Sequence, residues 1–141
     1  MRVLHLLGLC AVALAIAAPA VSAKHLKDFN NVKLEEAFIA RLSERDHFNS
    51  RGERLNTIAH IIRQDRANFH RFNRRHPEDQ PDGIFHEYEN RRILEILVDR
   101  ASVENGAVAA IIINQTPLVR VNIYSGMANG SWVRFVIVEI L

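Results

Sequence analysis

Cysteine is almost missing from this chain of 141 residues, which contains only Cys10. Because Cys10 falls within an apolar N-terminal stretch, the rest of the chain has no disulfide and no thiol nucleophile. Small secreted domains often depend on disulfides for stability. A disulfide-free fold of this size must instead rely on its apolar core.

Metal-binding spacing is missing as well. Zinc sites on a helix use ligands four residues apart, whereas His60 and His70 lie ten apart and about 80° from a common line. The other histidines outside the N-terminal stretch are scattered, at positions His25, His47, His76 and His86. We therefore expect no metal and no cofactor.

Long apolar runs occur only at the start, where Arg2 precedes an apolar stretch from Val3 to Ala18. This run is shorter than the roughly 20 residues that a spanning helix needs, and Val21-Ser22-Ala23 fits the small-x-small cleavage rule. The pattern predicts a signal peptide over residues 1–23, cleaved after Ala23, and a single secreted α+β domain over residues 24–141.

Two N-x-S/T sequons agree with an extracellular location, since this tripeptide is the acceptor for N-glycosylation. They begin at Asn114 and Asn129. Pro117 follows the first sequon directly and hinders its use, so Asn129 is the better candidate.

The charges are unevenly distributed. Residues 51–76 hold seven arginines against two carboxylates, and residues 77–99 hold seven carboxylates against two arginines. The favoured interpretation is that the two segments neutralise each other. The alternative is that the Arg-rich segment binds an anionic glycan or a membrane surface. No nucleic-acid partner is expected.

Three helices are predicted in the first two thirds of the chain. Leu34, Phe38 and Leu42 lie four apart and predict a helix over Val32–Asp46. The third helix is predicted over Ile84–Val103, with a cap at Asp82 and a stop at Asn105-Gly106.

The second helix has the best local signature. Ser50 to Glu53 reads as a capping box, and an amphipathic pattern of about 24 residues follows it. Its apolar positions are interrupted by one charged turn at Asp65 and Arg66.

After Gly106 the pattern becomes rich in β-branched and aromatic residues. Three strands are predicted, over Ala107–Asn114, Leu118–Tyr124 and Trp132–Leu141. The short connections favour antiparallel pairing. The predicted fold class is α+β, with two to three N-terminal helices packed on a C-terminal three-stranded antiparallel sheet.

Pairing Tyr124 with Trp132 gives the expected register of the last two strands. It places Val121 opposite Phe135 and makes one sheet face continuously apolar. The other face then leaves a second apolar set without a cover: Trp132, Val136, Val138 and Ile140. This uncovered set suggests a homodimer through the C-terminal sheet.

Aromatic and arginine side chains on a sheet face suit partner binding. The residues that we expect to form such a partner surface are Arg120, Tyr124, Trp132 and Arg134. The competing interpretation is a ladder of cross-strand pairs.

Candidate catalytic groups are few. His86 to Glu89 offers an imidazole and two carboxylates, and His70 and His76 lie near arginines, but the sequence shows no convergence of these groups. Two dibasic pairs, Arg74-Arg75 and Arg91-Arg92, are candidate processing sites. An enzyme is not expected.

Helices against an antiparallel sheet are similar in outline to cystatin-like inhibitors. The chain lacks their Q-x-V-x-G loop and their downstream Pro-Trp, and Gln115 to Val119 does not match the loop. No family is identified. We expect a secreted, extracellular, non-enzymatic effector or binding protein that acts through a protein partner. The alternatives are a protease-inhibitor-like module and, less favoured, a small hydrolase or a peptide precursor.

Overall fold

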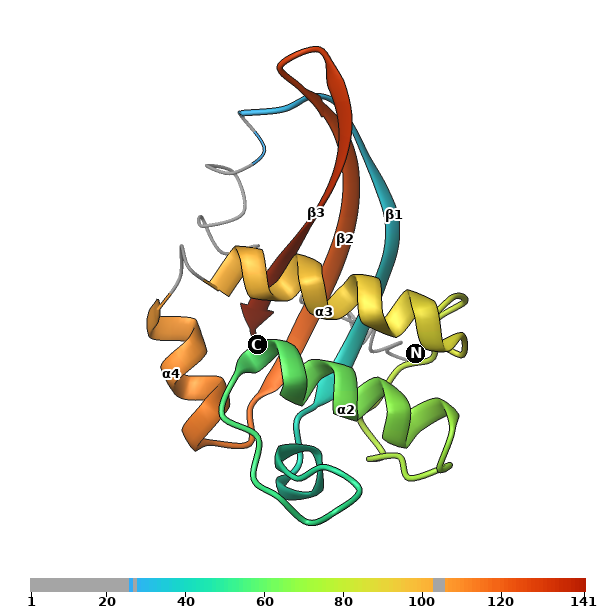
Figure 1. The fold of residues 1–141 in the computed structure, drawn as a ribbon, viewed down its shortest axis with the longest axis vertical. Coiled ribbons are helices and arrows are strands. Elements are labelled where there is room, and N and C mark those ends of the chain that lie inside the picture. The colour runs from blue at the N-terminus through green and yellow to red at the C-terminus, as the bar shows by residue number, and fades with distance from the viewer. Residues whose placement is uncertain (1–25, 27, 103–105) are drawn as a thin grey trace, which may run out of the picture.

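The protein is an α+β fold, as the sequence predicts, with helices packed on a three-stranded antiparallel sheet (Figure 1). The computed structural model describes residue 26, residues 28–102 and residues 106–141. The predicted signal peptide, its cleavage point after Ala23 and the single cysteine lie outside the described residues.

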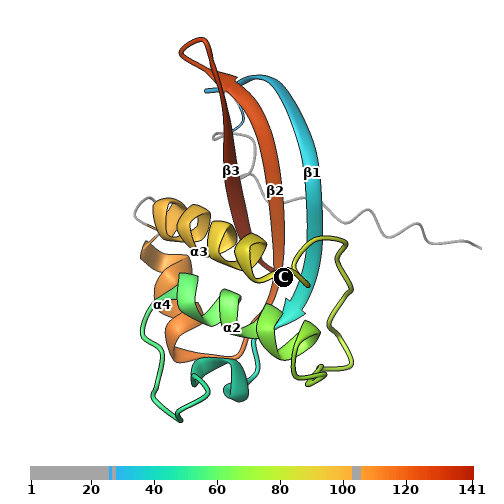
Figure 2. The same ribbon diagram turned by 45° about the vertical axis from the view of Figure 1, so that its right-hand side comes forward.

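The helices lie in the middle of the chain, between the first strand and the last two. The elements run in the order β1 (Asn30–Arg41), the 3-10 turn η1 (Glu44–His47), α2 (Ile58–His70), α3 (Tyr88–Ser102), α4 (Gly106–Asn114), β2 (Leu118–Ala128) and β3 (Ser131–Ile140). The strand order is β1-β2-β3, so the central strand is β2. The helices gather on one face, near one end of the sheet, and the strands extend beyond α3 (Figures 1 and 2).

The prediction of a helix over Val32–Asp46 was wrong, because this segment forms β1 and η1. A spacing of four is also two steps of the strand period, so Leu34, Phe38 and Leu42 fit both patterns. The buried side chains alternate, at Phe38, Ala40 and Leu42. Pairing with β2 therefore determines the local structure, with Phe38 opposite Val121.

The prediction of a strand over Ala107–Asn114 was also wrong, because residues Gly106–Asn114 form α4. A continuous apolar run carries no periodicity that separates a strand from a buried helix. The C-terminal end of α4 is held by side chains that approach its free carbonyls. His47 Nε2 lies 2.8 Å from the Ile112 oxygen, and Arg54 Nη2 donates to the Ile113 oxygen at 3.1 Å.

The predicted starts of the second and third helices were also wrong, because α2 begins at Ile58 and α3 at Tyr88. Ser50 does not cap α2, because Gly52 has φ +77° and the segment forms a turn, with Phe48 bridged to Arg54. The cap is Thr57, whose hydroxyl accepts from the His60 amide at 3.2 Å. Residues before Tyr88 do not join α3, because Asp82 accepts the amides of Ile84 and Phe85 and stabilises a separate turn.

The predicted register of the last two strands was wrong by three residues. The hairpin closes through a two-residue turn, Asn129-Gly130, with φ values of +50° and +79°. Ala128 therefore pairs with Ser131 and Val121 pairs with Val138. An odd shift exchanges the two faces of one strand relative to the other.

The apolar set that was expected to lack a cover is largely covered by the chain's own helices. Val136 is buried in the core with Val119 and Val121, and Val138 and Ile140 pack against this core. Trp132 is the exception, because 63% of its surface is exposed. The observation that suggested a homodimer is therefore largely removed, although the dimer itself stays a prediction.

Candidate functional site: an arginine-lined groove

The candidate site is a groove beside α2, made of two adjoining hollows of about 350 Å³ and 440 Å³. We call it the arginine groove. We call the hollow of about 350 Å³ the inner hollow, because the buried Arg91 lines it together with Arg63 and Arg71. The hollow of about 440 Å³ is the outer hollow, which is lined by Arg45 and Arg74. No lining residue of either hollow is a carboxylate. Both hollows share four lining residues: Asn49, Ser50, Gln64 and Phe72.

Helical spacing places one wall of the groove. The core face of α2 carries Ile58, Ile61, Ile62, Asp65 and Phe69. The face toward the groove carries His60, Arg63, Gln64 and Ala67, which recur every three or four residues. The chain leaves α2 after His70, and Asn73 turns it with φ +51°, so that Arg71 and Arg74 both remain beside the groove.

Two of the groove arginines are fixed by bonds within the chain. Arg63 Nη1 donates to Glu95 at 2.6 Å, and this carboxylate also lies 3.4 Å from His60. Arg91 is buried, and its Nη1 donates to the carbonyls of Phe85 and His86 at 2.7 and 2.8 Å. These two guanidinium groups therefore form a rigid basic wall.

The other three groove arginines have no carboxylate partner among the described residues: Arg45, Arg71 and Arg74. All three are exposed. The guanidinium carbons of Arg71 and Arg74 lie 5.2 and 5.8 Å from the centre of the Phe72 ring. These cations are positioned beside an exposed aromatic ring and are available to an anion from outside.

Positive charges lie close together at Arg91. Burial lowers the pKa of its guanidinium, and the nearby charges of Arg63 and Arg71 lower it further, against smaller opposite effects of Glu87 and Tyr88. Like charges gather only at a cost, and a bound anion removes that cost.

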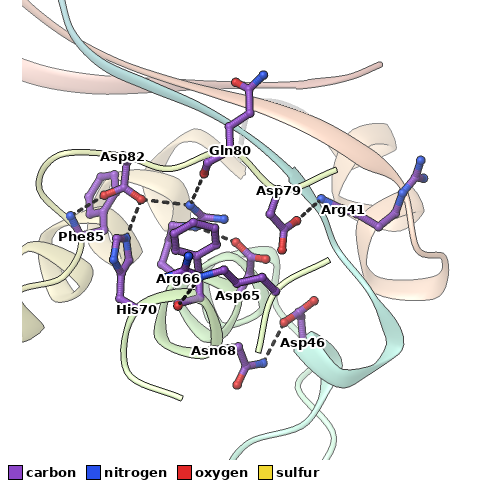
Figure 3. Close-up of polar contacts among 12 residues, drawn as sticks. Arg41, Asp46, Asp65, Arg66, Asn68, His70, Asp79, Gln80, Asp82 and Phe85 are labelled. Atoms are coloured by element: carbon purple, nitrogen blue, oxygen red, sulfur yellow. Dashed lines mark hydrogen bonds and ion pairs between the residues drawn. The ribbon is translucent and has the colours of Figure 1, made fainter. Parts of the chain in front are cut away.

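A second set of charges is buried on the core side of α2 (Figure 3). We call it the buried arginine network. Arg66 is fully buried and donates through Nε to Asp65 at 2.7 Å, and through Nη1 to Asp82 at 3.0 Å and to the Gln80 carbonyl at 3.1 Å. His70 Nε2 lies 2.7 Å from the same Asp82 oxygen. The rings of Phe38 and Phe69 lie 4.2 and 4.6 Å from the guanidinium carbon of Arg66.

The two carboxylates of the network differ in pKa. Burial raises the pKa of Asp65 to about 7, although Arg66 acts in the opposite direction. Burial also acts to raise the pKa of Asp82, but hydrogen bonds from His70, the Phe85 amide and Arg66 outweigh it and hold that pKa below its usual value. Asp82 is therefore the charged partner of Arg66, and Asp65 is the carboxyl group of the network that is more readily protonated.

Side-chain hydrogen bonds connect Gln64, which lines both hollows, to the buried Asp46. Gln64 Nε2 donates to Asn68 Oδ1 at 3.1 Å, and Asn68 Nδ2 donates to Asp46 Oδ1 at 2.8 Å. Asp46 accepts the amide and the hydroxyl of Ser43 at 2.8 and 2.6 Å. This capping box fixes η1, the element that carries Arg45.

The four residues expected to form a partner surface do not share one face. Arg120 and Tyr124 lie on the sheet face away from the helices, where Arg120 lies 3.8 Å from Glu139. Trp132 pairs with Met127 and Arg134 pairs with Ser125, so both lie on the opposite face. Arg134 donates to Glu35 at 2.8 Å.

The aromatic part of that expectation has a structural role. Tyr124 stacks on Phe135 with ring centres 5.4 Å apart, and Phe29 also stacks on Phe135, at 4.1 Å. This ladder fits the competing interpretation of cross-strand pairs for Tyr124.

The two sequons are placed at the ends of elements. Asn129 is exposed in the β2–β3 turn. Asn114 is the last residue of α4, and its amide donates to the Ala110 carbonyl at 2.8 Å. Their use as glycosylation sites stays a prediction.

Two of the histidine candidates are neighbours. The ring centre of His86 lies 6.3 Å from that of His70, whose Nε2 contacts Asp82, and His86 also lies 3.3 Å from the exposed Glu87. His76 lies 3.4 Å from Glu78. Neither His86 nor His76 lines the arginine groove. Within the described part of the chain, no three His, Cys, Asp or Glu side chains form a group that suits a metal ion.

The two dibasic pairs differ in accessibility. Arg91 is buried and Arg92 lies within α3, so a protease has no extended backbone to bind there. Arg74-Arg75 lies in exposed irregular structure. Release of the peptide from His76 to Asn90 would thus require α3 to unfold.

Sequence reasoning identified the Arg-rich character of the second helix but missed most of the groove. Arg45, Tyr88 and Arg91 come from other elements, and nothing in their local sequence marks them as neighbours of α2. The expectation that the basic and acidic segments neutralise each other fits Arg63 with Glu95 and Arg66 with Asp82. It does not describe Arg71 and Arg74.

Comparison with known proteins identified no relatives: no family model, no curated protein and no solved structure matches the chain. None of the described helices is long and apolar enough to cross a membrane. The functional argument therefore depends on the groove.

Proposed function

We propose that this chain is a secreted, non-enzymatic extracellular binding protein that holds a protein partner in the arginine groove. One observation carries the proposal: five arginines and no carboxylate line a groove that also presents aromatic rings. Arginine and aromatic side chains dominate the binding energy of protein interfaces. The complementary surface on the partner is an acidic segment with apolar side chains.

Secretion is supported by the N-terminal pattern and the sequons rather than by the groove. A non-enzymatic role is supported by the lining of the groove, which includes His60 but no carboxylate, because general acid–base catalysis needs groups that converge on one pocket.

The proposal is tested with a synthetic fluorescein-labelled peptide that contains glutamates and phenylalanine, measured by fluorescence anisotropy. We expect the double variant Arg71→Gln/Arg74→Gln to bind about 10-fold or more weakly than the unmodified protein. We also expect binding to weaken as salt rises, because the contacts are partly exposed.

The matched control is Arg92→Gln/Arg100→Gln, which removes the same charge from exposed positions on α3 outside the groove. An equal loss of affinity in the two double variants would mean that net charge, not the groove, attracts the peptide. That result would contradict the proposal.

A second candidate is the protease-inhibitor-like module. It is favoured by the β2–β3 hairpin, whose turn projects from the sheet beyond the helices and lies near the exposed Trp132 (Figure 1). Against it, both turn residues have positive φ, whereas a substrate-like loop is extended. Loss of protease inhibition on Trp132→Ala, with inhibition retained in Arg71→Gln/Arg74→Gln, would favour this candidate over the groove.

A further inference from the structure

We propose that the arginine groove contains two anion subsites, one on each side of Phe72, and binds an extended acidic protein segment in which an apolar side chain lies between two carboxylates. This inference rests on the proposed function and specifies the chemistry of the partner.

The division into two subsites follows from which residues line each hollow. Arg71 lines only the inner hollow and Arg74 lines only the outer hollow, whereas Phe72 lines both. Both guanidinium groups lie beside the Phe72 ring. The aromatic ring therefore lies within 6 Å of two cations that line different hollows.

Each subsite has its own available positive charge. In the inner hollow Arg71 is without a carboxylate partner, beside Arg63 and the buried Arg91. In the outer hollow Arg45 and Arg74 are both without one. A ligand with a single anionic group satisfies one hollow and leaves the like charges of the other unrelieved.

The residues between the subsites favour a protein segment over a sulfated glycan. Phe72 is 39% exposed and offers an apolar contact at the point where the hollows meet. The amide of Gln64 is oriented there by its bond to Asn68 and presents polar atoms to a backbone. A glycan recognised by charge alone would need neither the ring nor the amide.

Spacing along the partner follows from the geometry of an extended chain. Alternate residues of a strand share one face and lie about 7 Å apart, so an apolar side chain with a carboxylate on each side of it on the same face places the two carboxylates four residues apart, at roughly 14 Å. A peptide series that varies this spacing determines the distance between the subsites.

The test is a set of double-mutant cycles on the best-spaced peptide. Each glutamate is changed to glutamine in turn, and each peptide is measured against the unmodified protein, Arg71→Gln and Arg74→Gln. We expect each glutamate to contribute about 10-fold in affinity on the unmodified protein. In Arg71→Gln, changing one of the two glutamates should hardly alter the affinity of the peptide, and in Arg74→Gln the same should hold for the other glutamate. This expectation does not depend on the direction in which the peptide runs.

A third peptide replaces the central phenylalanine by serine and should bind several-fold more weakly. Unchanged urea midpoints of both protein variants serve as the folding control. If the two-glutamate peptide binds no more tightly than the one-glutamate peptides, the two subsites are refuted while the binding function stands.

A different result would refute the proposed function as well. If no peptide in the series binds and a heparin-like sulfated oligosaccharide binds in an Arg71-dependent and Arg74-dependent manner, then the partner is a glycan and not a protein segment.

Discussion

Two groups of arginines lie on or beside α2, and they differ in the carboxylates that surround them. Arg66 is fully buried, pairs with Asp82 and lies between two aromatic rings. Arg71 and Arg74 are exposed beside Phe72, with no carboxylate partner in the described chain. The comparison indicates that an arginine serves stability where the chain supplies the anion, whereas an arginine without such a partner suits the binding role that we propose.

The largest effect is expected from Arg66→Met. Removing the guanidinium leaves the Asp82 carboxylate with His70 and two backbone amides but without its arginine, and breaking a buried pair costs about 3–5 kcal/mol. Urea denaturation measures the loss in the free energy of unfolding. The matched change Arg71→Met should stay within about 0.5 kcal/mol, since it touches only exposed contacts. Similar losses in both variants would erase the distinction between network and groove.

The second effect concerns pH. The pKa of Asp65 is raised in the folded state from 3.8 to about 7, so its contribution to stability is intact below pH 3.8 and is lost as pH rises toward 7. The slope is at most about 1.4 kcal/mol per pH unit. Asp65→Asn should flatten this part of the stability profile and leave the protein more stable than the unmodified chain above pH 7.

Urea midpoints at intervals between pH 4 and pH 8 provide the measurement for Asp65→Asn. A variant profile parallel to that of the unmodified protein would show that Asp65 is ionised throughout. The network would then hold two charged carboxylates against one arginine.

The third prediction concerns a buried contact outside the buried arginine network, between His47 and α4. His47 is buried with its ring nitrogens 3.0 and 2.8 Å from the Ser43 and Ile112 oxygens. His47→Phe leaves these carbonyls without that partner and should cost about 1–3 kcal/mol. Hydrogen exchange should speed up in α4 first. Unchanged exchange in α4 would mean that the contact does not dock this helix.

The smallest effect on stability is expected from Arg71→Gln/Arg74→Gln. Neither residue has an ion pair within the described chain, so the free energy of unfolding should change by less than about 0.5 kcal/mol. The same variant should lose peptide affinity. A clear loss of stability would place these arginines with Arg66 as structural residues.

Local pattern predicted the fold class and two of the three strands, and it failed where two periods coincide. Leu34, Phe38 and Leu42 are four apart, which fits a helix and also alternate positions of a strand. The decision depends on pairing with β2, which lies about 80 residues later in the chain and cannot be read from the segment itself.

The register of β2 and β3 could have been predicted from the sequence, but the turn between them was placed wrongly. Asn129-Gly130 is the dipeptide that a two-residue hairpin turn prefers, because both residues take positive φ. Placing the turn there pairs Ala128 with Ser131 and puts Val136 and Val138 on the core face. The longer loop that was assumed instead shifted every pair by three residues.

The charged pair within α2 was misinterpreted for a different reason. Asp65 and Arg66 read as a break in the apolar stripe of α2, yet both side chains are buried within that stripe. Burial of such a pair depends on Asp82 and on the rings of Phe38 and Phe69. Only the ring of Phe69 belongs to the same helix, so the sequence of α2 alone could not show it.

The most direct test of the account is an NMR titration of the ¹⁵N-labelled protein with the two-glutamate peptide. The account predicts that amide shifts move at Arg45, at Arg71 to Arg74 and at Tyr88, while the β2–β3 hairpin around Trp132 and the buried amide of Arg66 stay in place. Shifts concentrated on Met127 to Arg134, with the groove unchanged, would contradict it and place the partner on the sheet.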